Sequence, residues 1–162
     1  MNKIFKGRIW GYMMRFTLIH VITYVIAGVI FMKLQNYETA FATLDKFSNF
    51  RPLDSPIVQA SALFQFLRGG FFALLLYPFY DTIVNSKRGW LILFGVLWGF
   101  TLIGSVTAAP GSIEGLIYTK VSLSEHLIGI PEVTVQMLVF SWLFFKWEQK
   151  VNKNRKKPGG QS

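Results

Sequence analysis

The chain has 162 residues, of which 52% are hydrophobic and only 15% charged, and its formal net charge is +9. A water-soluble globule of this length cannot hide so many apolar side chains behind so few charges, and disorder requires low hydrophobicity, so the composition excludes both. Because the sequence has no cysteine, disulfides, thiol redox centres and thiolate metal sites are excluded as well. We therefore expect an integral membrane protein.

Four apolar stretches are each close to the roughly 20 residues that a helix needs to cross the hydrocarbon layer. The predicted spans cover about 13–34, 57–80, 89–109 and 127–147. None of them alternates between apolar and polar residues with a period of two, which argues against a transmembrane barrel. The predicted fold is therefore all-α: a polytopic, integral membrane four-helix bundle that occupies residues 1–149.

The basic residues lie mainly on one side of these spans. Twelve Lys and Arg residues fall on that side: four before or at the first span, two between the second and third, and six after the fourth. Because cytoplasmic loops are rich in Lys and Arg, we expect both termini to be cytoplasmic and the protein to reside in the cell (plasma or inner) membrane. A cleaved secretory signal is the competing interpretation, but the first apolar run exceeds the usual ~7–15 residues of such signals.

The two loops on the opposite side have some helical character. The first carries an apolar stripe at helical spacing, formed by Tyr37, Phe41, Leu44 and Phe47. In the second, Pro110 and Gly111 end the third span, and Ser112 with Glu114 suits the start of a helical turn. These patterns predict short amphipathic extracytoplasmic helices, which form a lid in one interpretation and merely connect the spans in the other.

The C-terminal segment 150–162 is basic, ends in Pro and Gly, and has no apolar face, so we predict a disordered cytoplasmic tail. Basic residues beside a span attract anionic lipids by about 1 kcal/mol for each charge. The expected lipid contacts are Lys150, Lys153, Arg155, Lys156 and Lys157. Because no aromatic platform accompanies the basic run, we expect no binding of nucleic acid.

Arg68 is the most informative residue, because it is the twelfth of 24 residues in the stretch 57–80 and so should lie near the middle of the membrane. An arginine at that depth costs about 2.5–3.5 kcal/mol unless polar groups meet it. Polar side chains at comparable depths occur on the same span and on the first and fourth spans. We predict a polar network that contains Arg68, Gln65, His20, Tyr24, Gln136 and Glu132.

Three interpretations of this network stay open. The polar groups satisfy one another and fix the register of the helices; or Arg68 binds an anionic headgroup, carboxylate or ion; or the second span starts later, which puts Arg68 near the outer interface. Small residues allow helices to approach closely, and we expect this at Gly69, Gly70, Gly95 and Gly99.

The sequence contains no motif that is diagnostic of catalysis, of phosphate binding or of a metal site, and it indicates no cofactor. We therefore expect a small non-catalytic membrane protein that binds a partner subunit or an anionic, lipid-like ligand around Arg68. A component of an oligomeric transporter or channel, which includes a homo-oligomer, is the second hypothesis. A membrane-embedded enzyme is the third.

Overall fold

A computed structural model of the chain describes residues 3–44, 47–48 and 50–156, and every regular element in these ranges is helical. The elements in chain order are α1 (Lys3–Leu34), α2 (Tyr37–Thr43), α3 (Pro56–Gln59), α4 (Ser61–Leu76), η2 (Tyr77–Phe79), α5 (Tyr80–Asn85), α6 (Gly89–Trp98), η3 (Gly99–Ile103), α7 (Ile113–Tyr118), α8 (Leu123–Ile128) and α9 (Ile130–Lys156). The expected all-α class is confirmed for this part of the chain.

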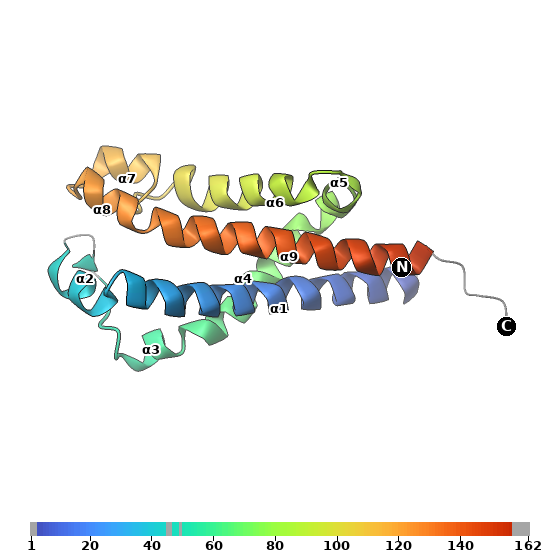
Figure 1. Ribbon diagram of the computed structural model, residues 1–162, viewed down its shortest axis with the longest axis horizontal. Helices are drawn as coiled ribbons and strands as arrows, with labels where there is room; N and C mark the ends of the chain where they lie inside the picture. Colours follow the sequence, from blue (N-terminus) through green and yellow to red (C-terminus); the bar gives the residue numbers. More distant parts are fainter. Residues whose placement is uncertain (1–2, 45–46, 49, 157–162) are drawn as a thin grey trace.

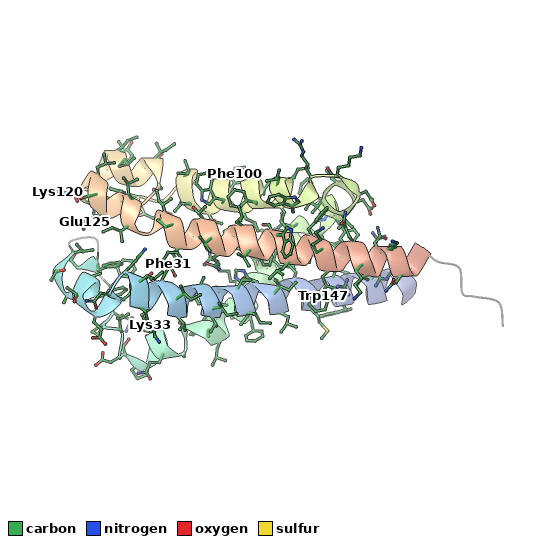
Figure 2. The ribbon with its side chains drawn as sticks, in the orientation of Figure 1. Phe31, Lys33, Phe100, Lys120, Glu125 and Trp147 are labelled. Carbon is green, nitrogen blue, oxygen red and sulfur yellow. The ribbon has the colours of Figure 1, made fainter. Side chains whose placement is uncertain are left out.

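Three stretches of helix are long and apolar enough to cross a membrane: Arg8–Leu34, Ser61–Asn85 and Leu123–Arg155. Their outer faces carry large apolar side chains such as Leu67, which is 73% exposed, and Phe100 on the shorter apolar helix Gly89–Ile103 is 74% exposed. Extensive apolar surface of this kind indicates a lipid bilayer around the protein. Figure 2 labels Phe100 on the outer side of the helical layer, away from α9.

The fourth apolar stretch is shorter than its predicted range 89–109, because it stays helical only through Gly89–Ile103. Its last five residues form a π-helical turn, in which the N–H of Gly104 donates to the carbonyl of Gly99 at 2.7 Å. At 1.5 Å per residue this helix is about 22 Å long, compared with the roughly 30 Å of a hydrocarbon layer.

The four long helical stretches lie in the order α4, α1, α9, α6 (Figure 1). Helix α1 contacts α4 and α9, and α9 contacts α6 on its other side. Helix α1 begins at the end where α9 finishes, whereas α2, α3, α7 and α8 gather at the opposite end. We call the end where α1 begins and α9 finishes the basic end, because Lys87, Arg88, Lys146 and Lys150 lie there. We call the opposite end, with α2, α3, α7 and α8, the loop end.

The core is aromatic and lies toward the basic end. Tyr12 and Phe16 of α1 and Phe140 and Phe144 of α9 are each at most 1% exposed. The ring centroid of Phe16 lies 4.8 Å from that of Phe140 and 5.0 Å from that of Phe144, in edge-to-face arrangements. Such pairs contribute about 0.5–1.5 kcal/mol beyond the burial of their area. They hold α1 against α9 at this level.

A tight connection joins α5 to α6 at the basic end. A Cβ added to Gly89 would lie 1.7 Å from the carbonyl oxygen of Ile83, so only glycine fits at the start of α6. Just before α5, Pro78 lies in the short 3-10 turn η2, where its missing N–H is tolerated. The helical stretch 61–85 is therefore interrupted near its end.

Helix α9 continues through Lys156, so residues 150–156 are helical and the predicted disorder of the segment 150–162 is wrong over that part. The physical reason is that the Lys and Arg residues of this segment are good helix formers and that cations interact favourably with a helix C-terminus. The remaining residues, 157–162, lie outside the described ranges.

Candidate functional site

A buried histidine lies where the middle of α1 meets α4 and α9. His20 is 2% exposed, and its Nε2 lies 3.3 Å from Oε1 of Gln65 on α4. Its ring makes edge contacts with Phe140 of α9 at 5.8 Å and with Phe72 of α4 at 6.1 Å. The structure thus brings together two members of the predicted polar set, at a level where all three candidate spans meet.

Gly69 brings α1 and α4 close together beside His20. A Cβ at this position would lie 3.2 Å from Cα of Thr17 and 3.2 Å from the His20 ring, so a larger residue would push the helices apart. At Gly70 the nearest atom would be 3.9 Å away, an ordinary contact. At Gly95 and Gly99 nothing described lies within 4 Å, so the structure shows no close helix packing there.

Arg68 lies outside this buried group, which corrects the expectation that it is the centre of a buried network. Its side chain is exposed, and its guanidinium carbon lies 5.3 Å from the centroid of the Phe72 ring. The physical reason is the helical rotation: three residues after the buried Gln65, the chain has turned about 60° away from the same face. Gly69 takes the inward position instead. It lies four residues after Gln65, which is one full turn of the helix plus about 40°, and both residues are buried.

Glu132 is found nearer the loop end, with a different partner. It accepts a hydrogen bond from the hydroxyl of Tyr37, the first residue of α2. Desolvation by burial, and then this hydrogen bond, raises the pKa of Tyr37 above its ordinary value. The side chain of Gln35 also donates to the carbonyl of Ile128 at 2.8 Å. These two bonds fasten the segment that follows α1 to the end of α8 and the first turn of α9.

The other two predicted members lie between these levels. Gln136 is buried, 8% exposed, one helical turn after Glu132, and Tyr24 is half-buried one turn after His20. The predicted set of six is therefore divided: His20 with Gln65 at mid-height, Glu132 with Tyr37 at the loop end, and Arg68 on the outer face of α4.

A second charged cluster, which the sequence analysis missed, is buried at the basic end. The side chain of Glu148 on α9 is fully buried and forms an ion pair with Nε of Arg15 on α1. The hydroxyl of Tyr80 donates to the other carboxylate oxygen at 2.8 Å. Within the described chain, Nη2 of Arg15 and the hydroxyl of the neighbouring Tyr12 have no hydrogen-bond partner.

An exposed ion pair accompanies this cluster. Nη2 of Arg8 lies 2.9 Å from Oδ1 of Asp81, and the Arg8 guanidinium also lies 4.6 Å from the centre of the Tyr80 ring. Asp81 and Glu148 are the two acids on the basic side of the predicted topology, amid twelve Lys and Arg residues. Two acids on a side otherwise rich in Lys and Arg are the signal in the sequence that could have predicted this cluster. In the structure each of them pairs with an arginine from α1.

The second loop is organised around His126, which is 2% exposed. Its Nδ1 accepts a hydrogen bond from the N–H of Gly111 at 3.0 Å, and its Nε2 lies 3.3 Å from Oγ1 of Thr119. Ser112 caps α7 by accepting from the N–H of Gly115 at 2.9 Å, as the predicted helical start required. This loop is an ordered unit that covers the start of α9.

The predicted lipid-contacting residues are placed in part. Lys150, Lys153 and Arg155 are exposed on α9; Lys156 ends the helix, and Lys157 lies outside the described residues.

Over the described ranges, no three His, Cys, Asp or Glu side chains come together as metal ligands.

No protein-family model matches this chain, and no curated protein or solved structure matches it. The most informative contrast in the structure is between Arg15, which has a buried carboxylate partner, and Arg68, whose neighbour among the described residues is an aromatic ring.

Proposed function

We propose that this chain is a non-catalytic membrane protein that binds a partner membrane subunit through the outer face of α4 around Arg68. The proposal depends on one observation: a guanidinium is exposed on an apolar helix face, at the level of His20, with Phe72 as its nearest ring. The flanking residues Leu67 and Phe71 are 73% and 58% exposed. The face is therefore apolar apart from one charge.

The topology that we propose has four crossings, with both termini in the cytoplasm of a plasma or inner membrane. Three candidate spans and the shorter α6 alternate in direction, since α1 begins and α9 ends at the same end (Figure 1). An odd number of crossings would put these ends on opposite sides. The excess of Lys and Arg at the basic end supports the cytoplasmic assignment.

The level of Arg68 can be judged from its neighbours. The next residue, Gly69, packs against Thr17 and His20, near the middle of the candidate span Arg8–Leu34. A lone arginine at mid-membrane costs about 2.5–3.5 kcal/mol on insertion scales. The contact with Phe72 returns only about 0.5–1 kcal/mol, as cation–π contacts at exposed sites do. The balance favours an acidic or polar group supplied from outside the chain.

A second copy of the chain is a poor source of that group. The acids within the candidate spans are Asp81, Glu125, Glu132 and Glu148, and none is at the level of Arg68. Asp81 and Glu148 already pair with arginines, and Glu132 accepts from Tyr37. Two α4 faces brought together would oppose two guanidinium groups. We therefore propose a different membrane protein, with a carboxylate in one of its spans.

The test is site-specific photocrosslinking in the full-length chain. A photoreactive side chain at Leu67 is expected to crosslink a second membrane protein, whereas one at Phe100, which is equally exposed on another helix, is the matched control. Arg68→Leu is expected to reduce the crosslinked product at least tenfold, because an unpaired partner carboxylate would be left in lipid. Arg68→Lys should retain most of it.

Two outcomes would contradict the proposal. A crosslink from Leu67 to another copy of this chain would instead favour the component of an oligomeric transporter or channel. Crosslinks to lipid alone, unchanged by Arg68→Leu, would show that the face has no protein partner.

A further inference from the structure

An apolar groove runs along the outer face of α1 toward the basic end. It has a volume of about 500 Å³, and its walls include Trp10, Met13, Met14, Leu18, Phe66 and Trp147. Trp10, Met14 and Leu18 are 60%, 71% and 45% exposed and recur every four residues, so they line one face of α1. From Trp10 to Leu18 the helix rises about 12 Å.

A second hollow, with a basic lining, lies beside the groove. This hollow also has a volume of about 500 Å³, and it is lined by Lys146, Trp147, Lys150, Val151 and Asn154 of α9. Trp147 belongs to both hollows and lies on the side of α9 that faces α1 (Figure 2). The apolar groove and this second hollow, which we call the cationic mouth, therefore share one wall, the indole of Trp147.

The charge of the mouth comes from two lysines. Arg15 also lines the apolar groove, but Glu148 neutralises it. Among the described residues, neither Lys146 nor Lys150 pairs with a carboxylate. The two tryptophans, Trp10 and Trp147, lie beside these charges, and indole rings favour the depth of lipid headgroups. The site thus has an apolar part, an interfacial part and a positive part, in that order.

We propose that this groove binds one anionic phospholipid of the leaflet at the basic end, with an acyl chain along α1 and the phosphate between Lys146 and Lys150. The volume is too small for a helix of a partner protein, because a helix of 12 Å length and about 10 Å diameter would need roughly 900 Å³, so the groove favours a thinner occupant such as an acyl chain. The two unpaired ammonium groups select against a zwitterionic lipid. The site lies on α1 and α9 and does not depend on the proposed partner at Arg68.

The first test measures which lipid the purified full-length chain retains by native mass spectrometry. The probe is an equimolar mixture of phosphatidylglycerol and phosphatidylcholine with identical acyl chains, added in mild detergent. The wild-type chain is expected to retain one phosphatidylglycerol with roughly tenfold preference. The double variant Lys146→Gln with Lys150→Gln should lose this preference. The control, Lys87→Gln with Arg88→Gln, removes the same charge from exposed positions at the basic end that line neither hollow, and it should change the preference less than twofold.

The second test fills the apolar part. Met14→Trp is expected to lower retention of both lipids at least fivefold, whereas Leu63→Trp, at a position 68% exposed on α4, is the matched control and should have no effect. Equal losses for the two charge-removing double variants would overturn the proposal, because they indicate non-specific attraction. Unchanged lipid retention in Met14→Trp would also overturn the proposal. So would a Met14→Trp variant that releases a bound protein but keeps its lipid, because the groove would then be occupied by protein.

Discussion

Arg15 in α1 and Arg68 in α4 both lie within candidate membrane spans, but their surroundings are opposite. Arg15 forms an ion pair with a fully buried glutamate, and a tyrosine from a third helix donates to the same carboxylate. Arg68 is exposed on an apolar face, with an aromatic ring as its neighbour. An arginine in a membrane helix can thus be satisfied within its own chain and hold helices together, or be directed outward from the chain, where our proposal places a partner.

The largest effect that tests this comparison is expected for Glu148→Gln. The amide keeps the shape but leaves Arg15 without its counter-charge, so we expect the free energy of unfolding to fall by about 3–5 kcal/mol. Thermal or denaturant unfolding of the full-length chain in detergent measures this loss. The double variant Arg15→Gln with Glu148→Gln should recover part of it, and Glu125→Gln in the second loop is a control. Unchanged stability of Glu148→Gln would remove the structural role of the cluster.

A smaller effect is expected for Asp81→Asn. The pair of Arg8 and Asp81 is solvent-accessible, with side chains 38% and 74% exposed. Surface pairs of this kind contribute about 0.2–1 kcal/mol, and salt screens them. Unfolding measured at low and at high salt should show a loss in this range that shrinks as the salt concentration rises. A loss as large as that of Glu148→Gln would contradict the distinction between the two ion pairs.

The smallest effect on the isolated chain is expected for Arg68→Leu. Because Arg68 has no ionic partner in the structure's described part, we expect the unfolding free energy to change by no more than about 0.5 kcal/mol, as for ordinary surface substitutions. Arg15→Leu, measured in parallel, should be strongly destabilising. If Arg68→Leu destabilised the purified chain by several kcal/mol, Arg68 would act within the fold and not through a partner.

The apolar runs in the sequence were sufficient to predict the helical class and the three long helices, because hydrophobic length decides which segments can cross a membrane. The pairing of His20 with Gln65 also follows from comparable depth on neighbouring spans. The direction of the Arg68 side chain could not be predicted in this way, because a rotation of about 60° around α4 separates an inward from an outward side chain. Spacing along one helix gives a face but not the neighbour that covers it.

The cluster at the basic end was missed for a related reason. Arg8 and Arg15 contributed only to the charge count that sets the orientation, although the two acids on that side had no evident role in topology. Their partners lie 73 and 133 residues away in the chain. A pairing over such separations depends on which helices are neighbours, and the pattern of a single sequence does not contain that information.

The short helical stretch Gly89–Ile103, which consists of α6 and η3, has a consequence for the membrane itself. After Ile103 the backbone leaves the helix, and Val106 is 91% exposed, so the segment that follows cannot lie in hydrocarbon without leaving amide groups unsatisfied. If α6 crosses the bilayer, the hydrocarbon on that side must therefore be locally compressed by about 8 Å, while it keeps its usual thickness around α1. Such a thickness mismatch costs a fraction of a kcal/mol per Å. The protein would then tilt or gather where the bilayer is already thin, and it would carry an uneven rim of deformed lipid with it.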